Sequence, residues 1–327
     1  LALWRVPESR DEAAGGVDWR GAVLATVGLG AIAYGLTEAS DRTRVDVAIA
    51  AVAAGLGALG AFVWLERRAR APMMPLELFG SRAFSGANLV TLLLYFALSG
   101  AMFFLPFDLI RVHGYSATMA GAAFLPFTLI MGVLSRWSGG LIDRYGARGP
   151  LTVGPLIAAA GFALMAAPGA GGSYWTTFFP GMVVLGLGMA VSVAPLTTAV
   201  MSAVEDRHAG VASGINNAAA RIAGLLAVAL LGAVAVSLFA DGLSHGLADA
   251  ALSPEMRRAV LDQAPRLAEA HTPDGVGEAE RAQIAGALRE AFVRTFRVIM
   301  LISAALAALA ALVARFTIDG RPRDHAG

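Results

Sequence analysis

Ten residues, Gly139–Arg148, combine charge with backbone freedom. Asp143, Arg144 and Arg148 supply one negative and two positive side chains, and Arg136 is the one other charged residue between positions 114 and 204. The glycines of the stretch are Gly139, Gly140 and Gly146. Glycine permits tight turns and close helix approach, so the stretch suits a short charged loop between two apolar segments. The chemistry it offers is charge pairing that holds one arrangement of helices, with loop shape and topology alone as the equal alternative.

A second polar group lies inside a long apolar run. Arg221 lies ten positions after Val211, where the run begins, and Asn216 and Asn217 precede it. A charged side chain at the centre of a membrane helix costs roughly 2.5–3.5 kcal/mol, so it needs a partner or a water-filled cavity. These residues are candidates for a polar cavity lining. The alternative is that Arg221 reaches the interface and that the two asparagines bridge helices. Ten residues, about 15 Å of helix, favour this structural role for Arg221.

Carboxylates are missing from the middle of every apolar run. Glu38 and Asp108 lie near one set of ends, and Glu66 and Asp143 lie near the other. Proton coupling needs an ionisable group within the membrane, so we expect the coupling carboxylates to lie outside this chain. Asp108 is a candidate for attracting cations at the outer mouth. The favoured alternative is an interfacial residue at a loop edge.

Aromatic and small residues are the remaining candidates for contact with a substrate. Tyr95 and Phe103, with Ser99 and Phe104, recur at one or two helical turns within one apolar run. Such a stripe fits the wall of a cavity near the membrane midplane, but for any single residue lipid contact and helix packing are the favoured explanation.

Several classes of chemistry are excluded by residue content. The chain has no cysteine, and its five histidines, His113, His208, His245, His271 and His325, are all expected in loops or tails. The turn at 210–214 contains Ser213 but no helix-borne histidine to act as a base. We therefore expect no catalytic residue, no metal site and no cofactor. The net charge of +1 gives no reason to expect a nucleic acid partner.

The elements that must position these residues are membrane helices. Hydrophobic residues make up 57% of the chain and charged residues 15%, well below the roughly 25% of a soluble domain. A membrane helix needs about 20 apolar residues, and eight runs qualify. They are approximately 21–37, 47–65, 84–107, 117–135, 150–167, 175–198, 211–239 and 298–314. The fold class predicted is therefore an all-α polytopic membrane protein.

Arginines distinguish the two membrane faces. One alternating set of segments holds Arg5, Arg10, Arg20, Arg67, Arg68, Arg70, Arg82, Arg136, Arg144, Arg148, Arg207, Arg315, Arg321 and Arg323. The short loops of the opposite set hold only Arg42, Arg44 and Arg111. Basic residues favour the cytoplasmic side, so both ends of this chain and the Asp143 loop are predicted to be cytoplasmic.

The eight runs divide as two plus six. Residues 1–19 are predicted to be a cytoplasmic linker, 20–66 a two-helix hairpin, and 67–82 a cytoplasmic connector. Residues 83–318 form a six-helix bundle, and 319–327 a cytoplasmic tail. Within the bundle, 240–297 is expected to be an extracytoplasmic loop with a pair of amphipathic helices. The first starts at Ser253-Pro254, and the second, Glu278–Arg297, runs into the last span. Since the chain begins without methionine, we expect an N-terminal bundle to be missing from it.

The order of several motifs resembles one family. The stretch Gly139–Arg148 is similar to the signature loop of the major facilitator superfamily. Together with 5–10, 74–79 and 210–217, followed by Arg221 and Gly224, it resembles the fourteen-helix drug:proton antiporters, the EmrB/QacA-like branch. In that branch two extra helices join two six-helix bundles. The resemblance implies that this chain is the C-terminal eight helices, and that its signature loop is the second-half copy.

The resemblance also implies a function. It predicts transmembrane transport, as part of a proton-coupled efflux antiporter for drugs or small amphipathic compounds, with alternating access between two bundles. The partners implied are membrane lipid, the missing N-terminal bundle, a small-molecule substrate and protons, in the bacterial inner (plasma) membrane. Two alternatives remain: a truncated or split half that only binds a partner, and a facilitator-type transporter of another metabolite.

Overall fold

The chain is mainly helical in its computed structural model. The model describes residues 18–39, 44–69, 74–248, 250, 252–273 and 275–319, with backbone alone at 143 and 268. No strand occurs in these ranges. Eight helices or helix pairs within them are long and apolar enough to cross a membrane. The predicted all-α fold with eight spans is therefore confirmed. The sequence stretches at 5–10 and 320–327 lie outside the described residues.

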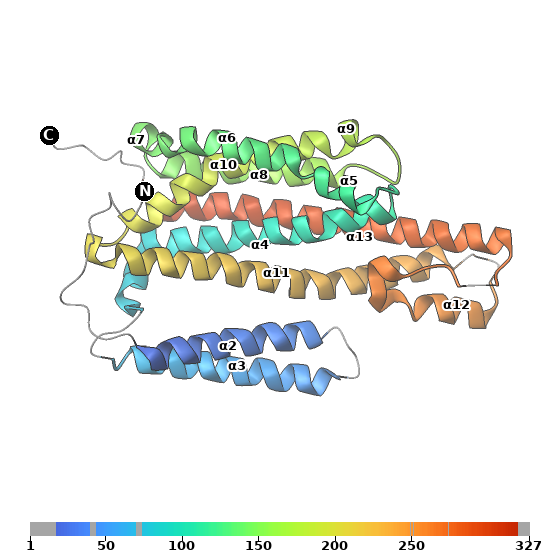
Figure 1. Cartoon of the computed structure of the whole chain (residues 1–327), viewed down its shortest axis with the longest axis horizontal. Helices are drawn as coiled ribbons and strands as arrows, with labels where there is room; N and C mark the ends of the chain where they lie inside the picture. The colour runs from blue at the N-terminus through green and yellow to red at the C-terminus, as the bar shows by residue number, and fades with distance from the viewer. Residues whose placement is uncertain are drawn as a thin grey trace.

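The first two spans form a hairpin. Helices α2 (Trp19–Glu38) and α3 (Val45–Glu66) pack along their whole length and lie beside α11 (Figure 1). Small residues make this possible: a Cβ atom at Gly55 would lie 2.7 Å from the carbonyl oxygen of Gly28. Asp18 begins α2 by accepting a hydrogen bond from the Gly21 backbone N–H at 3.0 Å. Glycines thus let the two helices of the hairpin approach closely.

The remaining spans form a six-helix bundle. Its helices are α4 (Arg82–Arg111), α6 (Leu125–Gly139), α8 (Arg148–Ala166), α10 (Phe179–Ser202), α11 (Ala209–Gly246) and α13 (Glu278–Thr317). Their neighbours run in the order α6, α10, α8, α13, α4, α11, and α11 also packs on α13 (Figure 1). Short helical pieces connect them: η2 (Leu76–Gly80), α5 (Ala117–Ala122), α7 (Leu141–Tyr145), α9 (Tyr174–Thr177) and η3 (Asp206–His208).

The fourth predicted span is interrupted. Helix α5 ends at Ala122 and α6 begins at Leu125, with Pro126 in its first turn. Proline lacks a backbone N–H and is tolerated at a helix start, where that group has no partner. The Tyr174 hydroxyl donates a 2.7 Å hydrogen bond to the Ala123 carbonyl oxygen at the break. Burial, with a smaller contribution from Tyr115, raises the pKa of Tyr174, so the phenol stays a donor.

A cap lies at the end of the bundle opposite α7. Helix α11 continues to Gly246, seven residues past its predicted end at 239, and α13 begins at Glu278. Between them lie α12 (Pro254–Leu261) and η4 (Ala264–Glu269), which share a hydrophobic core with the two extensions (Figure 1). The predicted start at Ser253-Pro254 is confirmed, and the Ser253 side chain accepts from Met256 N–H. The second arm, Glu278–Arg297, is the first part of α13 and runs without a break into the last span, as predicted.

Close packing of α8 on α10 yields a prediction about stability. A Cβ atom at Gly188 would lie 2.3 Å from the Ala158 backbone nitrogen, and backbone cannot move aside. We expect Gly188→Ala to destabilise the bundle by about 1–3 kcal/mol through overpacking. Gly132→Ala, on an open face of α6 with no neighbour within 4 Å, should stabilise by up to about 1 kcal/mol. Thermal unfolding in detergent, followed by circular dichroism, measures both, and equal melting temperatures would contradict the packing argument.

Candidate functional site

The signature loop is built as one short helix between two glycine turns. Helix α6 ends at Gly139, α7 spans Leu141–Tyr145, and Gly146 takes φ 67°, a left-handed conformation that favours glycine. The Gly146 N–H donates to the Ile142 carbonyl oxygen at 2.8 Å, and the Ile142 side chain is buried. These contacts fix the direction in which the chain enters α8. Gly146 thus makes the sharp turn that the glycines of this stretch predicted.

Arg148 makes its contact inside the same bundle. Its Nε donates a 2.7 Å hydrogen bond to the carbonyl oxygen of Ile318, which caps the end of α13. The last carbonyls of a helix lack partners within the helix and carry partial negative charge, so a cation is favourable there. On the other side of this helix end, a Cβ atom at Gly86 would collide with Thr317. The loop, α4 and α13 are therefore joined at one end of the bundle.

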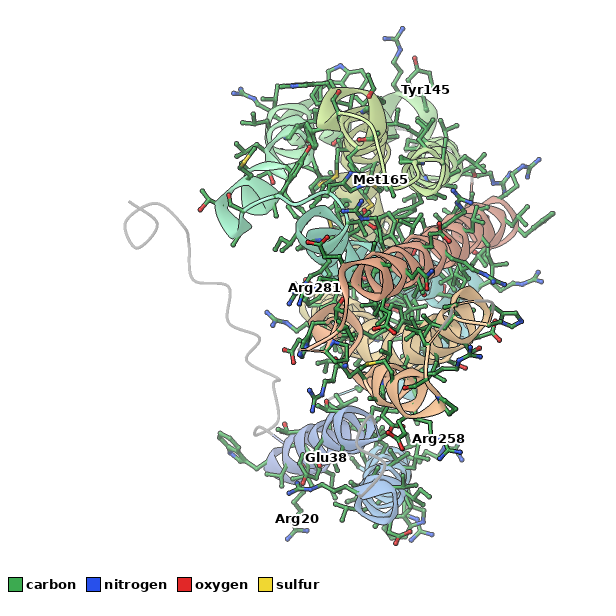
Figure 2. The ribbon with its side chains drawn as sticks, turned by 90° about the vertical axis from the view of Figure 1, so that its right-hand side faces the viewer. Arg20, Glu38, Tyr145, Met165, Arg258 and Arg281 are labelled. Carbon is green, nitrogen blue, oxygen red and sulfur yellow. The ribbon has the colours of Figure 1, made fainter. Side chains whose placement is uncertain are left out.

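Arg144 faces outward. Its guanidinium lies over the exposed Tyr145 ring, 5.5 Å from the ring centroid, and it forms no ion pair with any residue that the structure describes. Figure 2 shows Tyr145 at the edge of the molecule farthest from the α2–α3 hairpin. Asp143 lies within α7, and its side chain is outside the described atoms. The loop thus has one inward arginine and one outward arginine, which spacing alone did not distinguish.

A polar seam runs between α4 and α11. The fully buried Thr91 hydroxyl contacts Asn216 Oδ1 across the two helices and the Ala87 carbonyl oxygen on its own helix. One turn earlier, Asn88 Nδ2 donates to the Phe84 carbonyl oxygen at 2.9 Å, and its Oδ1 is buried with no partner among the described residues. Asn216 therefore bridges helices, which was the structural alternative for it.

Arg221 does not join this seam. It is exposed on α11 together with Asn217, one turn earlier, and it has no ion pair in the described part of the chain. Tyr95 is half-buried one turn after Thr91, and Ser99 one turn further lies close to Gly224 of α11. The structure brings Asn216 to Thr91 and leaves Asn217 and Arg221 on an open face of the bundle.

Phe103 is part of an aromatic row on α4. It is 40% exposed, and its ring meets those of Phe104 and Phe107 edge to face at 5.2 and 5.4 Å between centroids. Such edge-to-face pairs are favourable because the positive ring edge meets the negative ring face. Phe104 is buried and Phe103 points away from the bundle centre. Tyr95 and Phe103 therefore lie two turns apart on one helix without touching.

Asp108 is placed differently from the expected loop edge. It lies in the last turn of α4, 2% exposed, with its Oδ2 3.5 Å from Nε2 of His113, whose side chain is also buried. The His113 ring packs edge to face on Phe178, 5.1 Å between centroids. The described residues thus contain a buried carboxylate and imidazole at a span end. His245 likewise lies in α11 rather than in a loop.

No group of three or more His, Cys, Asp or Glu side chains in metal-binding arrangement occurs among the described residues. The features that remain are helix bundles, a charged turn and polar seams. Together they define a polytopic helical membrane protein whose bundle carries a charged signature loop at one end and a cap at the other.

The chain belongs to the major facilitator superfamily. The family model with that description matches residues 1–228. Among curated relatives, the multidrug resistance protein Stp of Mycobacterium tuberculosis is 34% identical over 81% of this chain and 48% of that protein. The tetracenomycin C resistance and export protein of Streptomyces glaucescens is 31% identical, over 94% and 58%. The lincomycin resistance protein of Streptomyces lincolnensis is 35% identical, over 74% and 54%. None of these names indicates a catalytic family.

The chain spans about half the length of the curated relatives it matches. A solved structure of similar fold is that of a bacterial homologue of the human lysosomal transporter spinster, inward-facing and unoccupied. It has a TM-score of 0.52 and 20% identity, over 95% of this chain and 68% of that one. At this identity the likeness concerns the fold alone.

The buried pair at the end of α4 yields a prediction with an internal control. Removing one partner of a buried pair leaves the other polar group without compensation, which costs about 3–5 kcal/mol. We expect Asp108→Ala to reduce stability by this order. Asp241→Ala removes the carboxylate of an exposed aspartate–histidine pair on α11, also at 3.5 Å, and should change stability by less than about 0.5 kcal/mol. Thermal unfolding in one detergent compares the variants, and equal effects would show that the Asp108 pair contributes nothing.

Proposed function

We propose that this chain is the C-terminal part of a proton-coupled efflux antiporter for drugs or other small amphipathic compounds. The observation that carries the proposal is the family membership together with relatives named for multidrug resistance, antibiotic resistance and export. The eight spans and the open faces of the bundle support it, because a two-bundle transporter needs a surface against which a second bundle moves. Substrate and protons would then pass between the bundles by alternating access.

The division of the chain follows the same proposal. The α2–α3 hairpin is the linker pair, α4–α13 is the C-terminal bundle, and the N-terminal six-helix bundle is the partner. The arginine asymmetry supports an orientation in the plasma membrane with α7 in the cytoplasm and the cap outside. The sequence positions of the hairpin, between the charged stretches at 1–19 and 67–82, support its role as a linker.

We also propose that the signature loop contacts the opposite bundle. Arg144 supports this, because it faces away from its own bundle and has no ion pair with a described residue. Arg148 is already engaged at the end of α13 and serves to hold the loop in position. A charge contact from Asp143 or Arg144 to the second bundle would stabilise the state in which the cytoplasmic ends are close.

The proposal predicts that this chain alone does not transport. In proteoliposomes with an imposed proton gradient, ethidium movement should equal that of protein-free liposomes, because one bundle cannot enclose an alternating cavity. Full-length Stp in the same lipids serves as the positive control. Adding the N-terminal six helices should restore movement. Robust exchange by the chain alone would overturn the two-part assignment, and co-purification of the two parts without transport would favour a half that acts only by binding a partner.

The loop contact has its own test. In the full-length protein, Asp143→Asn should shift the population toward states with separated cytoplasmic ends, because one side of the charge contact is removed. Spin labels on the cytoplasmic ends of the two bundles, measured by double electron–electron resonance, report this population. Glu205→Gln is the control, since Glu205 is exposed at the same end and already pairs with Arg207 at 2.8 Å. Unchanged distances and unchanged transport in Asp143→Asn would rule out the latch.

A further inference from the structure

A cavity of about 450 Å³ lies at the base of the cap. It is open to solvent on one side and is lined by the end of α4, by α11, by η4 with the residues that follow it, and by the first turns of α13. This is the end of the molecule away from α7 (Figure 1), and none of the lining residues belongs to the polar seam. The volume lies within the roughly 300–1,000 Å³ range of small-molecule pockets.

The floor of the cavity is apolar and rigid. Val112, Phe239 and Phe292 line it, and each is at most 5% exposed because each also belongs to the core of the cap. The rings of Phe239 and Phe292 meet edge to face, 6.2 Å between centroids. A hydrocarbon or aromatic group placed against this floor would lose contact with water without any rearrangement of the protein.

The rim of the cavity is cationic. Arg111, at the end of α4, and Arg289, on α13, both line it, and neither forms an ion pair with any residue of the described chain. No carboxylate occurs among the lining residues. Guanidinium groups pair with carboxylate and phosphate through two parallel hydrogen bonds, so the rim is complementary to an anionic head group.

The segment from Gln263 to His271, which forms part of the rim, is held in place by local contacts. The Gln263 side chain accepts a 3.1 Å hydrogen bond from the His271 backbone N–H, and His271 lines the cavity beside the arginines. Leu267, another lining residue, has φ 47° and ψ −104°, a conformation that is costly for leucine. Such strain persists only where surrounding packing determines it, and it concentrates at ligand sites.

We propose that this cavity binds an amphipathic anion, with its carboxylate or phosphate head at Arg111 and Arg289 and its apolar body on the Phe239–Phe292 floor. The position of Arg111 explains how such a molecule would arrive. Arg111 is the last residue of a membrane span, so the cavity opens where the span leaves the membrane-length part of the bundle. The same chemistry is offered by an anionic lipid and by a free fatty acid. The site is separate from the efflux function proposed above and does not depend on it.

The test measures binding to the purified chain in nanodiscs of phosphatidylcholine. The fluorescent fatty acid cis-parinaric acid is one probe, and its methyl ester is the neutral control with the same hydrocarbon body. We expect the acid to bind at least tenfold more tightly to chain-containing discs than to empty discs, and the ester to show no such preference. Discs containing phosphatidate should reduce parinarate binding if a bilayer lipid occupies the site, and leave it unchanged if the free acid is preferred. Both outcomes support an anion site and identify its source.

Matched variants separate the site from the general charge of the cap. The double variant Arg111→Gln with Arg289→Gln should weaken parinarate binding at least tenfold. Arg258→Gln with Arg281→Gln removes the same charge from exposed arginines of the cap that do not line the cavity, and should change binding less than twofold (Figure 2). Thermal unfolding of all variants checks that folding is retained. Equal binding of acid and ester, or equal loss in the two double variants, would overturn the proposal.

Discussion

The packing of α13 is the constraint on which the rest of the structure depends. This helix of 40 residues contacts α8, α4 and α11, and so touches half of the bundle at once. Its interface is rich in alanine and contains buried Ser303 and Thr295, which allow close approach. In a membrane, where apolar side chains gain nothing by leaving lipid for protein, such close contact is the main source of helix association. Arg148 and Gly86 then fix one end of this helix, and the core of the cap fixes the other.

The sequence predicted the spans well, because a run of about 20 apolar residues has few other uses. It predicted the ends and interruptions of the helices less well. Helix α11 continues past Phe239 through residues 240–246, which mix polar and apolar character, so hydropathy marked the span but not the end of the helix. The interruption between α5 and α6 lies beside Pro126, a residue type that can open or bend a helix, within a stretch that hydropathy reads as one continuous span.

The candidate site was predictable in part. The glycines and charges of 139–148 indicated a tight loop, which the structure contains, but nothing in the sequence indicated that Arg148 reaches Ile318, 170 positions away. Asp108 was assigned to a loop edge because it lies near a span end. The signal that was available is the five-residue spacing of Asp108 and His113 at a helix end, which the following Gly114, with φ 71°, marks. Contacts between residues a few positions apart can be predicted from a sequence, whereas contacts between distant helices cannot.

Helices α11 and α13 continue from the bundle into the cap, so they couple the orientation of the spans to the position of the cap. Forty residues of α-helix measure about 60 Å, roughly twice the hydrocarbon thickness of a bilayer. A rotation of the bundle by about 10° within the membrane therefore displaces a point 30 Å beyond the pivot by about 5 Å, which is nearly one helical turn. Both helices are uninterrupted over their lengths, so a tilt of the bundle would be carried into the cap. A small tilt of the spans therefore corresponds to a larger displacement at the far end of the molecule.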